Sequence, residues 1–169
     1  MKKIAILLLA IISLQQVNAQ GWKWQNPLPQ GNILSSVFFT GNMTGYVAGD
    51  FGTINKTTDG GETWTALSTG KTSWLTSVYF TGANTGYVAG DSGTIIKTTN
   101  GGASWTALST GTDLFLYSIF FTAADTGYAV GQMGIILKTV DGGLTWTTIY
   151  WAGGELRSVY FADTHTGWG

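Results

Sequence analysis

A unit of about 41 residues recurs along this chain of 169 residues. Trp64, Trp105 and Trp146 mark three copies, each 41 residues from the next. Residues 36–69 and 77–110 are identical at 26 of 34 aligned positions. A fixed period of this length is the signature of a repeat architecture, in which each unit buries its apolar face against its neighbours. The chain is therefore expected to fold as an array of similar units.

Each unit contains four short strand-like segments, which in the second copy span residues 75–80, 87–90, 94–98 and 104–108. They are rich in β-branched and aromatic residues and are separated by Gly, Asn, Asp and Ser. No segment keeps a 3.6-residue apolar period long enough for a helix. Four antiparallel strands in about 40 residues are typical of a β-propeller blade. The pattern predicts an all-β propeller of four-stranded antiparallel blades, with repeats near 33–73, 74–114 and 115–154 and a truncated repeat at 155–169.

The loop before the last strand of each unit carries the sharpest motif. Residues 57–64 read Thr-Thr-Asp-Gly-Gly-Glu-Thr-Trp, and residues 98–105 and 139–146 repeat the pattern. An Asp or Asn side chain can accept backbone N–H bonds in such a turn, and Gly permits a positive φ. The Trp is suited to packing between blades. The residues expected to have this structural role are Asp59, Gly61, Trp64, Asn100, Gly102, Trp105, Asp141, Gly143 and Trp146.

This loop resembles the Asp-box, also called the bacterial neuraminidase repeat. The flanking Thr-Gly-Tyr-Val-Ala-Gly-Asp at residues 44–50 and 85–91, with the Gly-Thr-Ile and Lys-Thr-Thr that follow, narrows the resemblance. The unit is similar to photosystem II stability and assembly-factor-like propellers over residues 22–169. In these families the resemblance implies that the Asp-box stabilises turns and lies away from any active site. It also implies protein partners.

The N-terminus has the pattern of a secretory signal peptide over residues 1–19. Two Lys residues precede an apolar run from Ile4 to Leu14, and small residues end at Ala19. A run of eleven residues is too short for a bilayer span, which needs about 20. We therefore expect cleavage after Ala19, no membrane span afterwards, and a secreted, periplasmic or cell-surface protein. Residues 20–169 are expected to form a partial propeller.

The repeats predict that this chain is the N-terminal fragment of a longer protein. Residues 22–25 align with the outermost strand of a blade whose other strands do not precede it, and the fourth unit stops after its second strand begins. Three blades with two partial ones cannot close a ring. Exposed sheet faces and edges favour aggregation or swapping, so residues 20–169 are not expected to be a well-behaved monomer.

Composition argues against several functional classes. Sialidases, which carry Asp-boxes, grip a carboxylate with three Arg, whereas this chain has one, Arg157. A single His, no Cys and no phosphate loop leave no recognisable metal or cofactor motif, so no metal and no cofactor are expected. Without its signal the chain has six basic and nine acidic residues, which does not suit nucleic acid. No catalytic residue is assigned.

The repeats diverge mainly in the loops between blades and between second and third strands, which lie on one face of a propeller. Repeats that share their strands and differ in the loops of one face suit a binding surface built on those loops. The side chains that could stack on a ligand or contact a peptide there are Trp74, Phe115, Tyr117, Trp151, Glu155 and Arg157. Inter-blade packing is the alternative role for the aromatic members of this set.

Two functions follow from these observations. The first is a secreted, non-enzymatic propeller that serves as a protein-binding or assembly scaffold. The alternative is a glycan-binding or glycoside-hydrolase propeller, sialidase-like or xyloglucanase-like, whose catalytic part lies outside this sequence. The identity of the protein partner or glycan is not predicted.

Overall fold

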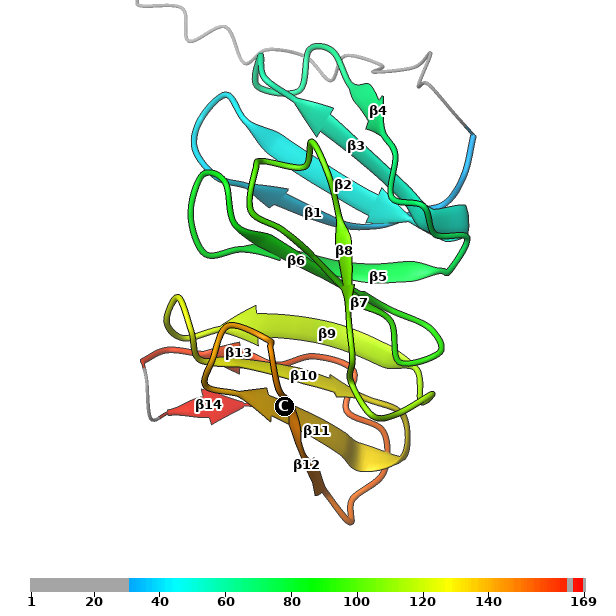
Figure 1. Ribbon diagram of the computed structural model, residues 1–169, viewed down its shortest axis with the longest axis vertical. Coiled ribbons are helices and arrows are strands. Elements are labelled where there is room, and N and C mark those ends of the chain that lie inside the picture. Colours follow the sequence, from blue (N-terminus) through cyan, green and yellow to red (C-terminus); the bar gives the residue numbers. More distant parts are fainter. Residues whose placement is uncertain (1–30, 164–165, 169) are drawn as a thin grey trace, which may run out of the picture.

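The computed structural model describes residues 31–163 and 166–168. The predicted signal peptide and the strand expected near residues 22–25 lie outside this range. The described part is built of strands and two short 3-10 turns, η1 (Asp50–Gly52) and η2 (Gln132–Gly134). Three four-stranded sheets follow one another along the long axis of the molecule (Figure 1). These sheets are the blades that the 41-residue repeat predicts.

Each blade is an antiparallel meander whose strands pair in chain order. Blade 1 consists of β1 (Leu34–Phe39), β2 (Gly45–Gly49), β3 (Thr53–Thr57) and β4 (Thr65–Leu67). Blade 2 consists of β5 (Leu75–Phe80), β6 (Gly86–Gly90), β7 (Ile95–Thr98) and β8 (Thr106–Leu108). Blade 3 consists of β9 (Leu116–Phe121), β10 (Gly127–Gly131), β11 (Ile135–Thr139) and β12 (Thr147–Tyr150).

A two-stranded piece follows blade 3. It pairs β13 (Tyr160–Phe161) with β14 (Gly167–Trp168) in antiparallel register. The described sheets do not close into a ring. The prediction of an incomplete propeller with four-stranded antiparallel blades is therefore confirmed.

The outermost strands are shorter than the sequence indicates. The pattern places the last strand of blade 2 at residues 104–108, whereas β8 begins at Thr106. The physical reason is the Asp-box turn, because the backbone N–H of Ser104 donates to Asn100 Oδ1 at 2.9 Å instead of to a neighbouring strand. Trp105 thus precedes the strand.

The blades are joined through two apolar layers. Tyr46 of blade 1 stacks on Phe80 of blade 2 with ring centroids 4.0 Å apart, and Tyr87 stacks on Phe121 of blade 3 at the same distance. Around these rings lie the two buried clusters of the structure. Trp105 packs against the cluster between blades 1 and 2, and Trp146 against the cluster between blades 2 and 3.

Hydrogen bonds between first strands accompany this packing. Ser36 Oγ accepts the backbone N–H of Val78 at 3.1 Å, and Ser77 Oγ accepts that of Ile119 at 3.2 Å. Ser118 Oγ accepts the N–H of Val159 at 3.2 Å. The same bond recurs three times, so the first strands of successive blades keep one relative position.

The connections divide between two ends of the blades. At one end, Gly60 N–H donates to Met43 O, so the Asp-box turn lies beside the connection between first and second strands. At the other, Gly52 N–H donates to Ser73 O, so the turn between second and third strands lies beside the connection to the next blade. We call these the Asp-box end and the loop end.

Candidate functional site at the loop end

The loop end gathers the divergent segments of the repeats. The turn after each second strand is bonded to the residue that precedes the first strand of the same blade: Asp50 N–H donates to Ile33 O, Asp91 N–H to Trp74 O and Gln132 N–H to Phe115 O, each at 2.9 Å. These bonds place residues from distant parts of a blade next to one another. They position the side chains of Trp74 and Phe115 at the start of β5 and β9.

Three of the predicted aromatic residues form a continuous row across the blades. Trp74 meets Phe115 edge to face with centroids 5.5 Å apart, and Phe115 meets Tyr117 at 4.8 Å. The Trp74 indole N–H donates to Ser35 Oγ of blade 1 at 3.1 Å. We call Trp74, Phe115 and Tyr117 the aromatic row.

A charged pair ends the row. The Arg157 guanidinium lies 5.0 Å from the centre of the Tyr117 ring and donates to Glu155 Oε2 at 2.6 Å. Tyr117 Oη donates to Glu155 Oε1 at 3.4 Å. Both residues of the pair are exposed. A row of contacting rings with a charged end suits contact with an extended segment rather than enclosure of a small molecule.

The structure thus brings together five of the six residues proposed from the sequence. Trp151 is the exception. Its backbone N–H donates to Gly134 O at 2.8 Å, beside η2, and no ring contact joins it to the aromatic row in the described part of the chain. Its side chain is 59% exposed, so it adds apolar surface at the same end.

The aromatic row also has the inter-blade role that the sequence left open. Phe115 and Tyr117 are half-buried, whereas Trp74 remains 45% exposed. Packing within the row holds each ring in place, and the outer faces stay accessible. The two roles are compatible, because a rigid aromatic side chain loses little conformational entropy on binding.

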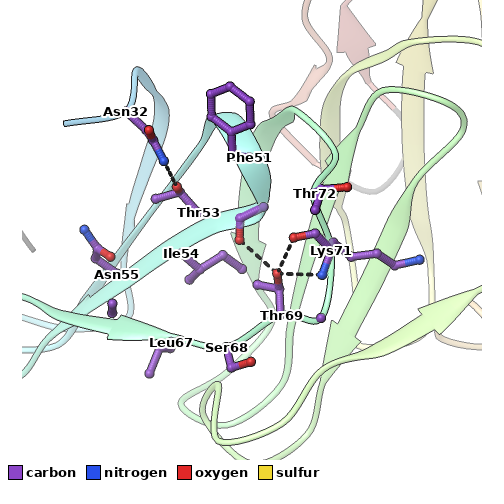
Figure 2. Close-up of a pocket in the computed structure, with 13 residues that line it drawn as sticks. Asn32, Phe51, Thr53, Ile54, Asn55, Leu67, Ser68, Thr69, Lys71 and Thr72 are labelled. Carbon is purple, nitrogen blue, oxygen red and sulfur yellow. Dashed lines mark hydrogen bonds between the residues drawn. The ribbon is translucent and has the colours of Figure 1, made fainter. Parts of the chain in front are cut away.

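A cavity of about 510 Å³ at the loop end of blade 1 was not expected from the sequence. Figure 2 shows Phe51 standing at its rim, Asn32 donating to Thr53 Oγ1 at 3.0 Å, and the turn around Thr69 closing the opposite wall. Thr69 Oγ1 donates to Gly52 O at 2.9 Å and accepts the Lys71 N–H at 3.1 Å. These bonds fix the loop that forms the wall.

Two bulky residues at this end have left-handed backbone conformations. Phe51 has φ 54° and Met133 has φ 56°, and both side chains are largely exposed. Such conformations are uncommon for large side chains outside functional or tightly constrained turns. The only sequence signal for them was the divergence of the turns, where the second blade has Ser92 instead.

The Asp-box turns have a uniform geometry. Asp59 Oδ1 accepts the Thr63 N–H at 2.9 Å, and Thr57 Oγ1 accepts the Gly61 N–H at 2.9 Å. The same bonds join Asn100 to Ser104 and Asp141 to Thr145. Gly61, Gly102 and Gly143 have positive φ values. The side chains at these positions stabilise the turns on which the blades depend.

Hydrogen bonds from Thr residues lower the pKa of two of these carboxyl groups. The pKa of Asp59 is lowered from 3.8 to about 2, chiefly by the Thr63 side chain, then by its backbone N–H and by Thr57. The pKa of Asp141 is lowered to about 2, chiefly by Thr145 in the same way. Both residues are half-buried and their carboxylates are hydrogen-bonded within the turns, which indicates a structural role rather than proton transfer in catalysis.

The described residues hold no group of three or more His, Asp or Glu arranged to bind a metal ion. Within the same ranges, no helix has the length and apolar character that crossing a bilayer requires.

A family model for the photosynthesis system II assembly factor YCF48 matches residues 14–115, which is more than half of the chain. The chain belongs to the YCF48 family. The match includes the first two Asp-boxes, Trp74 and Phe115. The resemblance stated from the repeat is therefore confirmed.

Solved structures agree with this assignment. A structure described as YCF48 bound to D1 peptide is 26% identical, with a TM-score of 0.66, and the match covers 75% of this chain and 44% of that one. YCF48 from Cyanidioschyzon merolae is 24% identical, with a TM-score of 0.65, and the match covers 72% and 41%. The chain thus spans less than half the length of these YCF48 structures.

A glycoside hydrolase has the same fold. The GH74 enzyme of Niastella koreensis is 18% identical with a TM-score of 0.62, over 76% of this chain and 24% of that enzyme. At this identity the likeness concerns the fold alone. A search of curated proteins found no match.

Proposed function

We propose that this member of the YCF48 family is a non-enzymatic scaffold that binds an extended segment of a partner protein across the aromatic row. The observation that carries the proposal is the continuous contact from Trp74 through Phe115 and Tyr117 to Arg157. Aromatic side chains with exposed faces are the commonest energetic anchors of protein interfaces. The solved YCF48 structure with a bound D1 peptide supports peptide binding as the mode.

The geometry of the row supports binding better than catalysis. Glycoside hydrolysis uses two carboxyl groups that face a scissile bond. Glu155, the carboxylate at the end of the row, has its two oxygens engaged by Arg157 and Tyr117. These bonds support a structural role for Glu155, which fixes the positions of Arg157 and Tyr117 on the binding surface. The GH74 fold likeness keeps a glycan as the second candidate ligand, since aromatic faces also stack on sugars.

Peptide and glycan arrays probed with the intact chain test this function. We expect extended peptides to bind, and Trp74→Ala and Phe115→Ala each to weaken the binding at least tenfold, as for an interface hot spot of about 1.4 kcal/mol or more. Leu144→Ala is the matched control, because Leu144 is 73% exposed at the Asp-box end. Binding of glycans alone, or peptide binding that is unchanged in the two aromatic variants, would contradict the proposal.

We also propose that the protein acts outside the cytoplasm. The basic residues, apolar run and small residues of positions 1–19 support this assignment. Mass spectrometry of the protein from its native host should find Gln20 as the N-terminal residue. An intact Met1 or Lys2 terminus in the mature protein would contradict it.

A further inference from the structure

The end of the aromatic row already holds one cationic group. The Arg157 guanidinium lies over the Tyr117 ring, with 5.0 Å between the guanidinium carbon and the ring centre, and a carboxylate oxygen of Glu155 accepts its N–H. An aromatic face and a carboxylate together are a strong receptor for a planar cation. At this position Arg157 of the same chain already occupies the site formed by Tyr117 and Glu155.

The same two chemical groups occur one blade earlier, at Trp74 and Asp91. The backbone bond from Asp91 N–H to Trp74 O, at 2.9 Å, makes the two residues spatial neighbours. Trp74 is 45% exposed, and Trp is the aromatic side chain that attracts cations most strongly. Asp91 Oδ1 is shielded from water and has no hydrogen-bond donor in the described structure. Because this oxygen is shielded, Asp91 acts on a cation at the indole face through the charge of its carboxylate rather than through a bond to Oδ1.

The net charge of the loop end also favours the binding of a cationic group. Its described connecting segments carry the acidic residues Asp50, Asp91, Asp113 and Glu155 and the basic residues Lys71 and Arg157. Arg157 is already paired with Glu155. Lys56 and Lys97 donate to the carbonyl groups of Gly101 and Gly142 at the Asp-box end. The loop end is therefore more negative than positive, which complements a basic partner.

We propose that Trp74 and Asp91 receive an arginine side chain of the partner's extended segment, in the way that Tyr117 and Glu155 hold Arg157. This inference rests on the proposed function, because it names the residue type that the aromatic row selects. The partner's guanidinium lies against the exposed indole face, and the Asp91 carboxylate attracts it. Apolar residues of the segment cover the neighbouring rings.

The repeat supplies a matched control for Asp91. Asp50 occupies the equivalent position in blade 1, its N–H donates to Ile33 O at 2.9 Å, and its Oδ1 likewise lacks a donor. Its neighbour is aliphatic Ile33, so no aromatic face accompanies the carboxylate. Asp50→Asn and Asp91→Asn therefore remove the same charge from the same backbone position of two blades. The two sites differ in their neighbour, which is Trp74 for Asp91 and Ile33 for Asp50.

The test uses three fluorescein-labelled 15-residue peptides of Gly, Ser and Leu that differ only at a central Arg, Leu or Glu. Fluorescence anisotropy with the intact chain should show the Arg peptide binding about fivefold more tightly than the Leu peptide, from a cation–π contact of about 1 kcal/mol. The Glu peptide should bind most weakly. The preference for Arg should disappear in Asp91→Asn and remain in Asp50→Asn.

The outcomes separate this inference from the proposed function. Equal binding of the Arg and Leu peptides, lost in Trp74→Ala, would overturn the arginine site and leave the peptide scaffold standing. Equal loss of preference in Asp50→Asn and Asp91→Asn would also overturn it, since a general field effect would then explain the selectivity. Failure of all three peptides to bind would contradict both proposals. Thermal unfolding of each variant verifies that the fold is intact.

Discussion

At the scale of single residues, the Asp-box carboxylates link the stability of this protein to pH. Their pKa values of about 2, against 3.8 for an unperturbed Asp, mean that the folded state favours the charged form. A lowered pKa contributes stability that is present above about pH 4 and is lost as the pH falls towards 2. The cause is the set of hydrogen bonds from Thr63 and Thr145 to the ionised carboxylates.

Replacing Asp59 and Asp141 with Asn should flatten this acid transition. Asn is tolerated, because Asn100 already accepts the Ser104 N–H and donates to Ser104 Oγ at 2.9 Å. Thermal unfolding between pH 5 and pH 2 should show a smaller decline for the Asp59→Asn/Asp141→Asn variant than for the parent chain. An identical decline in both proteins would show that other groups govern the acid response.

Gly102 should be intolerant of a side chain. Its φ is +86°, and a Cβ there would lie 2.7 Å from Leu67 Cδ1 of the preceding blade. Gly102→Ala is expected to lower the free energy of unfolding by about 1–3 kcal/mol, measured by urea titration, from backbone strain together with this clash. Gly111→Ala is the control, since its φ is +72° but a Cβ there would meet nothing within 4 Å. Equal losses in the two variants would mean that the contact with Leu67 is unimportant.

At the scale of the blade, the strands follow from patterns within one repeat. The limits of β5, Leu75–Phe80, agree with the sequence, because alternating apolar residues bounded by turn residues define a half-buried strand. The beginning of β8 does not agree, because the Asn100 side chain takes the N–H of Ser104. That competition between a side chain and a neighbouring strand is decided by turn geometry, which the residue pattern alone does not specify.

Successive blades are joined by a Tyr–Lys pair that binds the next Asp-box. Tyr46 Oη and Lys56 Nζ both donate to Gly101 O, at 3.0 and 2.9 Å. Tyr87 and Lys97 bind Gly142 O in the same way. Tyr46 is fully buried, so Tyr46→Phe should cost about 0.5–1.5 kcal/mol of unfolding free energy in chemical denaturation.

Tyr128→Phe is the matched control for this prediction. In the described residues Tyr128 has its Lys138 neighbour, with Nζ 5.5 Å from the ring centre, but no Asp-box carbonyl to bind. Its replacement should change stability much less than Tyr46→Phe does. A comparable loss in Tyr128→Phe would show that the hydroxyl matters for another reason than the bond to the next blade.

At the scale of the whole molecule, the outer face of blade 1 has no blade against it in the described structure. Val37 is 59% exposed, whereas its equivalents Val78 and Ile119 are 4% and 3% exposed between blades. The exposure is confined to part of this face, because Val47 is 8% exposed and Asn55, which replaces the Ile96 and Leu137 of blades 2 and 3, is 1% exposed with no partner for its amide in the described residues. Exposed apolar sheet faces promote association.

The chain should therefore self-associate through this face. Sedimentation velocity over a range of concentrations is expected to show oligomers, and Val37→Lys should shift the distribution towards the monomer. Val140→Lys is the control, because Val140 is 64% exposed in the third Asp-box turn and not on the face. A monomer at all concentrations for the parent chain, or equal effects of both substitutions, would contradict this prediction.

The local features of this protein were determined by its sequence. The 41-residue period, the Gly and Asn positions of the turns and the alternating strands specify four-stranded blades, because hydrogen-bonded turns and half-buried strands depend on neighbouring residues. The sequence also identified the members of the aromatic row as divergent residues of one face. It did not predict their contacts.

Contacts between blades required the tertiary structure. Trp74 meets Phe115, and Arg157 covers Tyr117, across about 40 residues of sequence. Whether such rings touch depends on the twist of each sheet and on the rotamers that packing against the next blade allows, and neither is encoded within a single repeat. The cavity beside Phe51 and the adjacency of Asp91 to Trp74 have the same origin, because both arise where a turn between second and third strands meets the connection between blades 1 and 2.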